Sequence, residues 1–216
     1  MGQKIHPNAI RLGVNKPWKA NWFAKKGEFA ENLRKDTEIR AFLFEKLRAA
    51  GLDSVVIKRY SNRLELHIHV ARPGVVIGRG GSGIEQVKKS LMQKYGTNIE
   101  LKVYEVKRPE VSASLIADNI VNQLERRIVP KFICQRVIES AKATNTIKGI
   151  RIWVSGRIKG AEIARTEKFQ WGTVPLQTIR ANVEYAYLTA QVPNAGKHGI
   201  KVWIFTGEKF SYDLND

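Results

Sequence analysis

The run at residues 78–83, Gly-Arg-Gly-Gly-Ser-Gly, is the part of this sequence whose residue types and spacing best suit a chemical task. Glycines let a backbone approach a ligand closely, and the first turn of a following helix offers free N–H groups to a phosphate. The run fits two phosphate-binding patterns. One is Gly-x-Gly-x-x-Gly, typical of dinucleotide-binding turns, and the other is Gly-x-x-Gly, typical of loops that hold single-stranded nucleic acid. A third interpretation is that the glycines only form a tight turn.

The residues on either side help to distinguish these interpretations. A dinucleotide-binding turn follows a buried parallel strand directly and is followed by further strand–helix units. Here Arg72-Pro73-Gly74 separates the glycines from the preceding strand, and a single strand at about 99–103 comes before two helices. We therefore favour a nucleic-acid loop with two lysines on the helix beside it, and the tight turn remains the alternative. The candidate residues are Gly78, Arg79, Gly80, Gly81, Lys88 and Lys89.

Catalytic and metal-binding patterns are missing from the sequence. It has no paired carboxylates in a motif, no nucleophile with its base and no Gly-x-x-x-x-Gly-Lys-Ser/Thr loop. The single cysteine, Cys134, excludes an internal disulfide and a multi-cysteine zinc site, and its apolar neighbours predict a buried thiol. His67 and His69 share the polar face of a strand, but no third ligand is near in sequence. We expect no catalytic residue, no metal and no cofactor.

Positive charge is distributed along the whole chain. Of 216 residues, 37 are Lys or Arg and 20 are Asp or Glu, so the formal charge is +17 (37 − 20). Such a chain binds polyanions by releasing their counterions, which favours nucleic acid or an anionic membrane surface as its partner. No apolar run approaches the ~18 residues that span a bilayer, and the N-terminus has no apolar signal segment. We predict a soluble, intracellular protein that contacts nucleic acid through several surfaces and contacts no membrane. The competing hypothesis is an RNA-processing or DNA-repair enzyme that docks through the glycine loop, and it requires a catalytic set.

The hydrophobic pattern divides the first half of the chain into an arm and a domain. Residues 1–37 have too little periodicity for a core and are expected to form an extended basic arm. Residues 38–107 follow the order helix, strand, strand, short helix, helix, strand. Asp36 or Thr37 is expected to cap the first helix, and Gly51 to end it.

Residues 108–216 are expected to form a second α+β domain, with a helix pair and an antiparallel sheet. The first helix begins near Ser112, and Pro130 separates it from a second that ends at about Ala143. Residues 156–172 are read as a basic loop or hairpin, and strands are expected at about 150–154, 183–187 and 200–205. The tryptophans at 153, 171 and 203 are expected in the core, with base stacking as the alternative.

Ordered motifs give this pattern a family resemblance. The 38–107 segment resembles a type II KH domain, in which a Gly-x-x-Gly loop joins two adjacent helices. Over essentially its whole length the chain resembles the bacterial family of small-subunit ribosomal protein three. The motifs are Met-Gly-Gln-Lys-Ile-His-Pro-Asn at 1–8 with Arg-Leu-Gly at 11–13, Trp-Phe-Ala at 22–24, Ala-Arg-Pro-Gly-Val-Val-Ile-Gly at 71–78, Gln-Leu-Glu-Arg-Arg at 123–127, Ser-Gly-Arg at 155–157 with Gly-Ala-Glu-Ile-Ala-Arg-Thr-Glu at 160–167, and Lys-Val-Trp-Ile-Phe-Thr-Gly-Glu at 201–208.

The resemblance implies a non-enzymatic structural constituent of the cytoplasmic ribosome, in the head of the small subunit. It implies binding to small-subunit rRNA and contact with mRNA at the entrance tunnel, where mRNA is positioned for translation and structured mRNA is unwound. The implied neighbours are small-subunit proteins ten and fourteen, with proteins four and five near the tunnel.

The resemblance also assigns residues of this chain to each RNA. Contact with mRNA is expected at Arg126, Arg127, Lys131 and Arg136. Contact with rRNA is expected at Lys4, His6, Arg11, Lys16, Lys19, Arg72, Arg157, Lys159, Arg165 and Lys168. The chain departs from the family at Phe132 and Gln135, where cations are common, which predicts weaker unwinding. It departs again at Gly80, where a second cation is usual, and the short tail after Phe210 predicts no C-terminal extension.

Overall fold

The structure is a computed structural model that describes residues 4–60, 63–96 and 98–209. The chain divides into two compact units. One unit is Trp18–Lys107; the other combines the segment up to Pro17 with the part from Arg108 onward. Among the described helices, none is both long enough and apolar enough to cross a bilayer. The tail after Phe210 lies outside the described residues.

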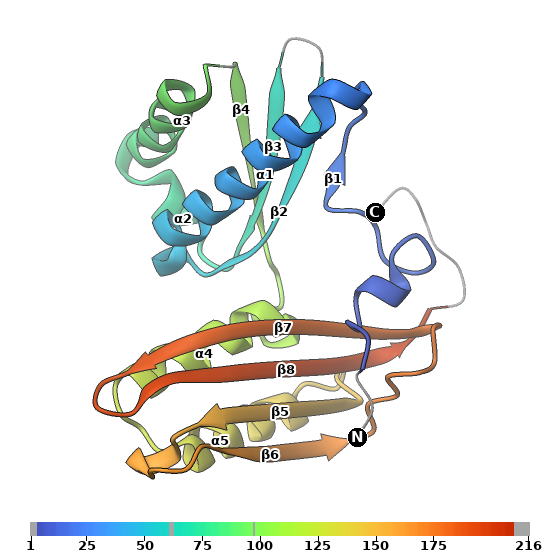
Figure 1. The fold of residues 1–216 in the computed structure, drawn as a ribbon, viewed down its shortest axis with the longest axis vertical. Coiled ribbons are helices and arrows are strands. Elements are labelled where there is room, and N and C mark those ends of the chain that lie inside the picture. Colours follow the sequence, from blue (N-terminus) through green and yellow to red (C-terminus); the bar gives the residue numbers. More distant parts are fainter. Residues whose placement is uncertain (1–3, 61–62, 97, 210–216) are drawn as a thin grey trace. The chain divides into compact units, whose positions relative to one another are not determined.

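The 18–107 unit packs three helices on a four-stranded sheet (Figure 1). The strands lie in the order β1-β2-β3-β4; β2 and β3 are antiparallel, whereas β1 with β2 and β3 with β4 are parallel. The elements are β1 (Ala20–Asn21), α1 (Lys26–Lys46), β2 (Leu52–Arg59), β3 (Leu64–Val70), α2 (Pro73–Ile77), α3 (Ser82–Tyr95) and β4 (Ile99–Glu105). The expected KH-type order of helix, strand, strand, helix, helix, strand is confirmed.

Alternation along β3 explains how this sheet receives its helices. Successive side chains of a strand point to opposite faces. Leu64, Leu66, Ile68 and Val70 are therefore buried together, and they pack with Ile39 and Leu43 of α1 and with Leu91 of α3. The opposite face carries the polar residues of the strand.

Helix α1 begins at Lys26, so the expected start at Asp36 or Thr37 is wrong. Residues 26–35 are rich in good helix formers, and Lys35 Nζ lies 2.6 Å from Glu31 Oε1 one turn earlier. Asp36 lies inside the helix, where it is buried and forms an ion pair with Arg59 of β2. An aspartate that precedes an apolar stripe has the sequence signature of a cap, and the tertiary ion pair gives it another role.

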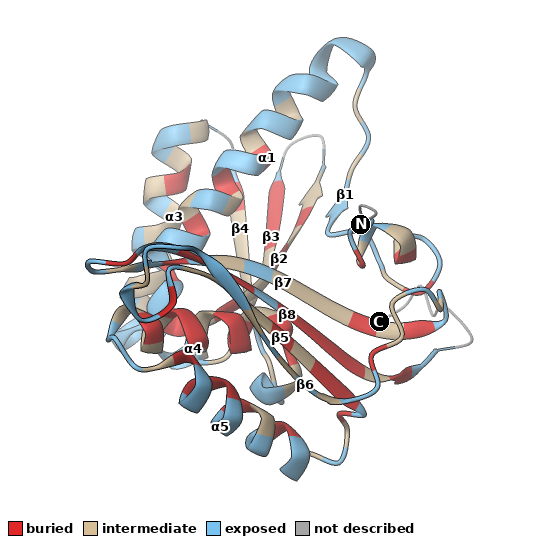
Figure 2. Cartoon of the chain, turned by 60° about the horizontal axis from the view of Figure 1, so that its bottom comes forward, coloured by how far each residue is buried: buried red, intermediate tan, exposed pale blue. Residues whose placement is uncertain are grey.

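The second unit packs two helices on one face of a four-stranded antiparallel sheet (Figure 2). The strands lie in the order β6-β5-β8-β7. The elements are the 3-10 turn η1 (Ala9–Arg11), α4 (Ala113–Glu125), α5 (Pro130–Ala143), β5 (Gly149–Gly156), the 3-10 turn η5 (Ile158–Gly160), β6 (Arg165–Gly172), β7 (Ala181–Val192) and β8 (Gly196–Glu208). Both expected helix starts are confirmed: Ser112 caps α4, since its Oγ accepts a hydrogen bond from Leu115 N (3.3 Å), and Pro130 opens α5. Of the loop and the hairpin considered for residues 156–172, the structure shows the hairpin, since β6 pairs with β5.

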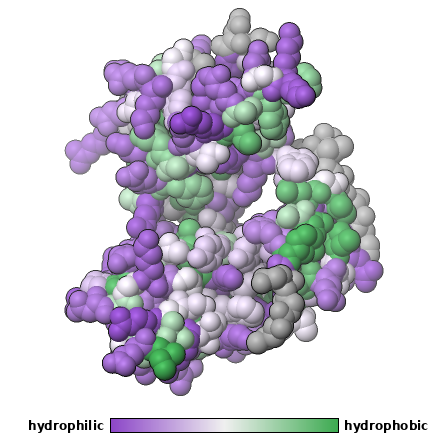
Figure 3. Space-filling view, in the orientation of Figure 1, coloured by the Kyte–Doolittle hydropathy of each residue, from purple (hydrophilic) through white to green (hydrophobic). Residues whose placement is uncertain are grey.

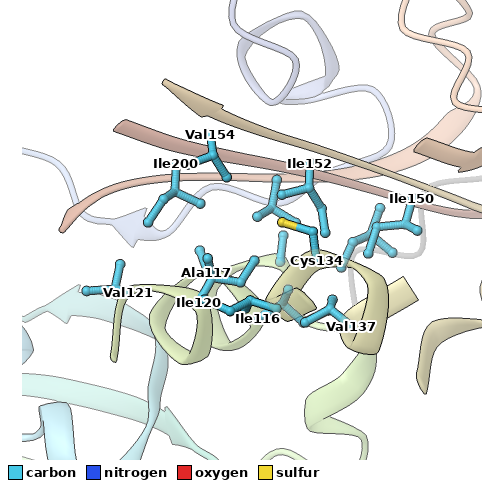
Figure 4. Packing of buried hydrophobic residues seen from close by; sticks show 14 of the residues in the cluster. Ile116, Ala117, Ile120, Val121, Cys134, Val137, Ile150, Ile152, Val154 and Ile200 are labelled. Carbon is cyan, nitrogen blue, oxygen red and sulfur yellow. The ribbon is translucent and has the colours of Figure 1, made fainter. Parts of the chain in front are cut away.

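Figure 4 shows the core of this unit, where apolar residues of α4 and α5 meet those of β5 and β8. Cys134 lies among them, with Ile150 and Ile152 of β5 opposite. Burial, with a smaller contribution from the charge of Glu167, raises the pKa of Cys134 to about 12. The thiol is therefore protonated at neutral pH and packs as a small apolar side chain, as expected.

Residues 4–17 pack against the second unit and do not form a free arm. Arg11 is completely buried, and its guanidinium donates hydrogen bonds to five backbone carbonyls. These are the carbonyls of Pro7 (2.8 Å), Pro175 (3.3 Å), Leu176 (3.0 Å), Thr178 (2.8 Å) and Ala181 (2.8 Å). Asn15 Nδ2 adds a bond to Ile179 O (2.7 Å). The expected contact of Arg11 with rRNA is therefore corrected, because its donors are used inside the protein.

Candidate nucleic-acid interface

The glycine loop joins α2 to α3 at the surface of the 18–107 unit. Its 3-10 turn η3 (Arg79–Gly81) follows Gly78, and Gly78, Arg79 and Gly80 are exposed. The φ angles of Gly78, Gly80 and Gly81 are +69°, +62° and +83°, a region that residues with a Cβ adopt only at a cost. The loop therefore presents its own backbone and the Arg79 side chain to solvent.

The glycines of this run have two different roles. A Cβ on Gly83 would lie 2.5 Å from Val76 O, and one on Gly78 would lie 3.1 Å from Gly83 N, so close packing of α2 against α3 requires both. A Cβ on Gly80 or Gly81 would meet nothing within 4 Å. The tight-turn interpretation thus explains Gly83 and Gly78. Above Gly80 and Gly81 the backbone is open to a ligand.

A hollow of about 500 Å³ lies between the last turn of α1, α2 and α3. Lys89 lines it, as does Lys46 at the end of α1. Lys88 is half-buried and is not among the lining residues, because neighbouring helix residues point about 100° apart. Of the two lysines expected beside the loop, Lys89 therefore lines the hollow and Lys88 does not. The other lining lysine, Lys46, was recognisable in the sequence only as a cation in a last helical turn.

The turn between α4 and α5 carries the residues expected to contact mRNA. Arg126, Arg127, Lys131 and Arg136 are all exposed. Arg127 N donates to Leu124 O (2.8 Å), and the next N–H, that of residue 128, donates to the carbonyl of residue 123 (3.2 Å). These bonds form a Schellman motif, and Arg127 occupies its left-handed position with φ +63°, where glycine is usual.

Arg157 and Lys159, which follow β5, are exposed as well, and Lys159 lies beside the α4–α5 turn. Lys159 and Arg127 line one pocket of about 280 Å³, formed by the α4–α5 turn, η5 and the turn between β7 and β8. Arg157 Nε donates to Ala161 O (2.9 Å) within its own loop. Sequence reasoning assigned Arg127 to mRNA and Lys159 to rRNA, whereas the structure brings them to one site.

Two further residues expected to contact rRNA, Arg165 and Lys168, have partners within the β5–β6 hairpin. Arg165 forms an ion pair with Glu167 (3.2 Å). Lys168 Nζ lies 4.8 Å from the ring centroid of Trp153. Both side chains are exposed at the surface of β6, but neither lines the pocket that Arg127 and Lys159 share.

Two basic residues of the segment 4–17, His6 and Lys16, have partners within the protein. The His6 ring packs edge-on against Tyr185, with centroids 4.8 Å apart, and Lys16 Nζ donates to Asn8 Oδ1 (3.2 Å). Burial and then the charge of Lys16 lower the pKa of His6, so this imidazole is neutral at physiological pH. Lys4 is exposed. Hydrophobic side chains gather over η1 in Figure 3, and Ile5 of this segment is 66% exposed.

Lys19 and Arg72 belong to the 18–107 unit, and both side chains are exposed. The carbonyl of Lys19 accepts a hydrogen bond from Arg40 Nη2 (2.6 Å), and Arg40 Nη1 donates to Val55 O (2.5 Å). Sequence reasoning missed Arg40, which ties the segment before α1 to β2. The sequence signal for a structural role of Arg40 was its position one helical turn after Asp36, on the same face of the helix.

The histidines considered as metal ligands belong to a polar layer on the 18–107 sheet. The rings of His67 and His69 each lie 5.3 Å from the Tyr104 ring, and His67 Nε2 lies 3.4 Å from Glu65 Oε2. Burial raises the pKa of Glu65, but the hydrogen bond from His67 and the charge of Lys102 outweigh it, so that the pKa is lowered. Within residues 4–60, 63–96 and 98–209, no group of three or more His, Cys, Asp or Glu side chains is placed to hold a metal ion.

The tryptophans differ in burial. Trp203 is buried, with ring centroids 5.0 Å from Trp153 and 5.2 Å from Tyr185. The core interpretation is therefore confirmed for Trp203. Trp153 and Trp171 are half-buried, and base stacking there stays an alternative.

Comparison with known proteins gives a match for each unit. Residues 38–111 match the sequence model of the family described as KH domain, and residues 120–204 match that of Ribosomal protein S3, C-terminal domain. The chain is 45% identical over 208 residues to small ribosomal subunit protein uS3 of Idiomarina loihiensis, covering 96% of this chain and 91% of that protein. Its identity to uS3 is 44% for Shewanella baltica and 45% for Shewanella amazonensis, with 96% of this chain and 90% of each relative covered.

Proposed function

Because the chain belongs to the uS3 family of small-ribosomal-subunit proteins, which are structural constituents and not enzymes, we propose that it binds rRNA in the head of the small subunit. It also contacts mRNA at the entrance tunnel and positions it for translation. Its neighbours are small-subunit proteins ten and fourteen, with proteins four and five near the tunnel.

The open backbone of the glycine loop is the observation that carries RNA binding. Gly80 and Gly81 leave free space where any side chain would stand, and Arg79 is exposed beside them. A phosphate strand approaching this loop meets backbone N–H groups and a guanidinium. Loops of this kind clamp about four nucleotides of single-stranded RNA.

We expect Arg79→Asp combined with Gly80→Asp to weaken binding of the full chain to single-stranded RNA by about tenfold at moderate salt, because two carboxylates then face the phosphates. Fluorescence anisotropy over a range of salt concentrations measures both the affinity and its salt slope. Gly96→Asp is the matched control. Gly96 also has a positive φ (+62°) and open space, but it lies at the other end of α3.

Loss of affinity in the double variant with retention in Gly96→Asp supports the loop as the RNA site. Equal affinity and equal salt slope in all three proteins would exclude it. Thermal unfolding is compared in parallel, since Asp at position 80 has open space but a strained backbone, as Asp at position 96 also does.

The α4–α5 turn supports the proposed contact with mRNA. Arg126, Arg127, Lys131 and Arg136 are exposed around it. Phe132 is 63% exposed, and Gln135 is exposed as well, so neither adds charge to this surface. A surface with fewer cations attracts phosphates less strongly, and unwinding by this chain is therefore weaker than in relatives with cations at both positions.

A further inference from the structure

Three loops of the second unit converge on the pocket of about 280 Å³ beside the α4–α5 turn, and each contributes a left-handed residue. Arg127, Lys159 and Asn194 line the pocket, with φ angles of +63°, +58° and +68°. In the described part of the chain these three are the non-glycine residues with positive φ. A left-handed backbone is costly for a residue with a Cβ, and such residues gather at sites that hold ligands.

Turn chemistry alone accounts for Asn194. Pro193 precedes it, and Ala195 N donates to Val192 O (3.2 Å). This is a type II turn, which favours proline at its second position and glycine or asparagine at its third. Asn194 therefore requires no ligand to explain its backbone.

At the other two positions local turn chemistry does not explain the residue type, since the Schellman motif that sets the left-handed backbone of Arg127 favours glycine there. Arg127 ends α4 and Lys159 stands in η5, at backbone angles that glycine adopts without cost. Elsewhere the chain uses glycine for the same purpose, at Gly51 (φ +69°) and Gly96 (φ +62°), which also end helical segments. At 127 and 159 this chain has a cation where glycine would fold more easily. The presence of a cation at these two strained positions favours a function for the two charged side chains.

The rest of the pocket offers apolar surface to a ligand. Ile128 and Val192 contribute apolar surface, and the buried His198 also lines the pocket. None of the described residues that line it is acidic. A nucleotide combines the two required properties, since a base has an apolar face and its phosphate is an anion.

We propose that this pocket receives one unstacked nucleotide of a bound RNA strand, with the base against Ile128 and Val192 and the phosphate held by Arg127 and Lys159. The inference rests on the proposed RNA-binding function and adds to it a site for a single base. It also unites two residues that sequence reasoning had assigned to different RNAs.

The test uses the full chain, a short oligouridylate and two variants, Arg127→Gly and Lys159→Gly. Each removes a cation and relieves a strained backbone at once. We expect each to leave Tm unchanged or to raise it, and yet to weaken RNA binding by roughly fivefold. Each should also reduce the salt slope by about 0.7, the value for one phosphate contact on a single strand. A purely structural role predicts the higher Tm without the loss of affinity.

Three further variants separate charge, strain and apolar contact. Asn194→Gly alters the lining of the same pocket but removes no charge, so it should leave the salt slope of RNA binding unchanged. Ile128→Ser should lower the affinity without changing the salt slope, because it removes an apolar contact only. Ile163→Ser, at a residue that is 82% exposed and does not line the pocket, should change neither.

Several outcomes would overturn the inference. In one such outcome, Arg127→Gly, Lys159→Gly and Ile128→Ser keep the RNA affinity of the original chain, whereas the double variant at Arg79 and Gly80 loses affinity. The chain then binds RNA through the glycine loop, and the pocket is not an RNA site. If these pocket variants instead lose affinity for oligoglutamate alone, the occupant is an acidic protein segment. If the original chain binds no RNA, both this inference and the proposed function fail.

Discussion

Arg11 and Arg79 represent two uses of a cation in the same chain. Arg11 is buried, and its hydrogen bonds end on carbonyls of its own unit. Arg79 is exposed at the tip of a loop whose backbone is open. Sequence composition counts both as positive charge available to RNA. Burial distinguishes them, because a guanidinium whose donors are already satisfied has none left for a phosphate.

Arg11→Ala should destabilise the protein by about 3 kcal/mol, because the carbonyls of residues 175–181 lose a charged donor and a cavity replaces the side chain. Urea unfolding measures this change. Lys4→Ala, an exposed cation of the same segment, is the control and should not move the midpoint. A variant Arg11→Ala that keeps its stability but loses RNA affinity would show that Arg11 is an RNA ligand after all.

At the scale of elements, helix α1 is positioned by an ion pair inside its length. Asp36 is buried, its Oδ2 accepts a hydrogen bond from Trp22 Nε1 (2.7 Å) and its Oδ1 accepts one from Arg59 Nε (2.9 Å). Together these contacts join the segment before the helix, the helix itself and β2. The segment therefore has a defined path although its own sequence has little periodicity.

Asp36→Asn should destabilise the 18–107 unit by about 3 kcal/mol, because breaking a buried ion pair at one partner leaves the charge of Arg59 uncompensated. Hydrogen exchange of the β2 and β3 amides measures the effect in the full chain. Glu31→Gln breaks the exposed pair with Lys35 on the same helix and should leave the exchange rates unchanged. Equal effects of the two substitutions would mean that Asp36 acts only as a solvated residue.

At the scale of the whole molecule, one compact unit is built from two segments that are far apart in the sequence. The segment up to Pro17 belongs with residues from Arg108 onward, and Trp18–Lys107 forms the unit between them in sequence. The basic residues of the chain are therefore divided between two compact units. Such a chain is suited to contact one large polyanion at several places.

Replacing Arg126, Arg127 and Lys131 together by alanine should slow translation through a stable mRNA hairpin more than translation of an unstructured message, because in the proposed function these cations attract the phosphates of the separated strand. Reconstituted translation of two matched messages gives the ratio. Removing three exposed cations of the same unit, Lys142, Lys197 and Lys209, should leave it unchanged. Equal slowing on both messages by the first set would reject an unwinding role.

Local pattern was sufficient for most elements and for the glycine loop. The alternation of Leu64, Leu66 and Ile68 identified β3, and Pro130 marked the start of α5, because strand period and proline geometry act over a few residues. The Gly-x-x-Gly pattern likewise located an exposed loop. Asp36 misled the helix boundary, since its partner Arg59 is distant in sequence.

The sequence by itself determined the order of elements in residues 38–107, the helix pair that follows, the basic character and the family, because these follow from residue types and their spacing. Only the tertiary structure decided that Arg11 is buried and that Arg127 and Lys159 share a pocket. Both facts depend on which distant segments pack together. Burial of a side chain, and the meeting of two residues in one pocket, are set by long-range packing, and the spacing of residues along the chain does not show them.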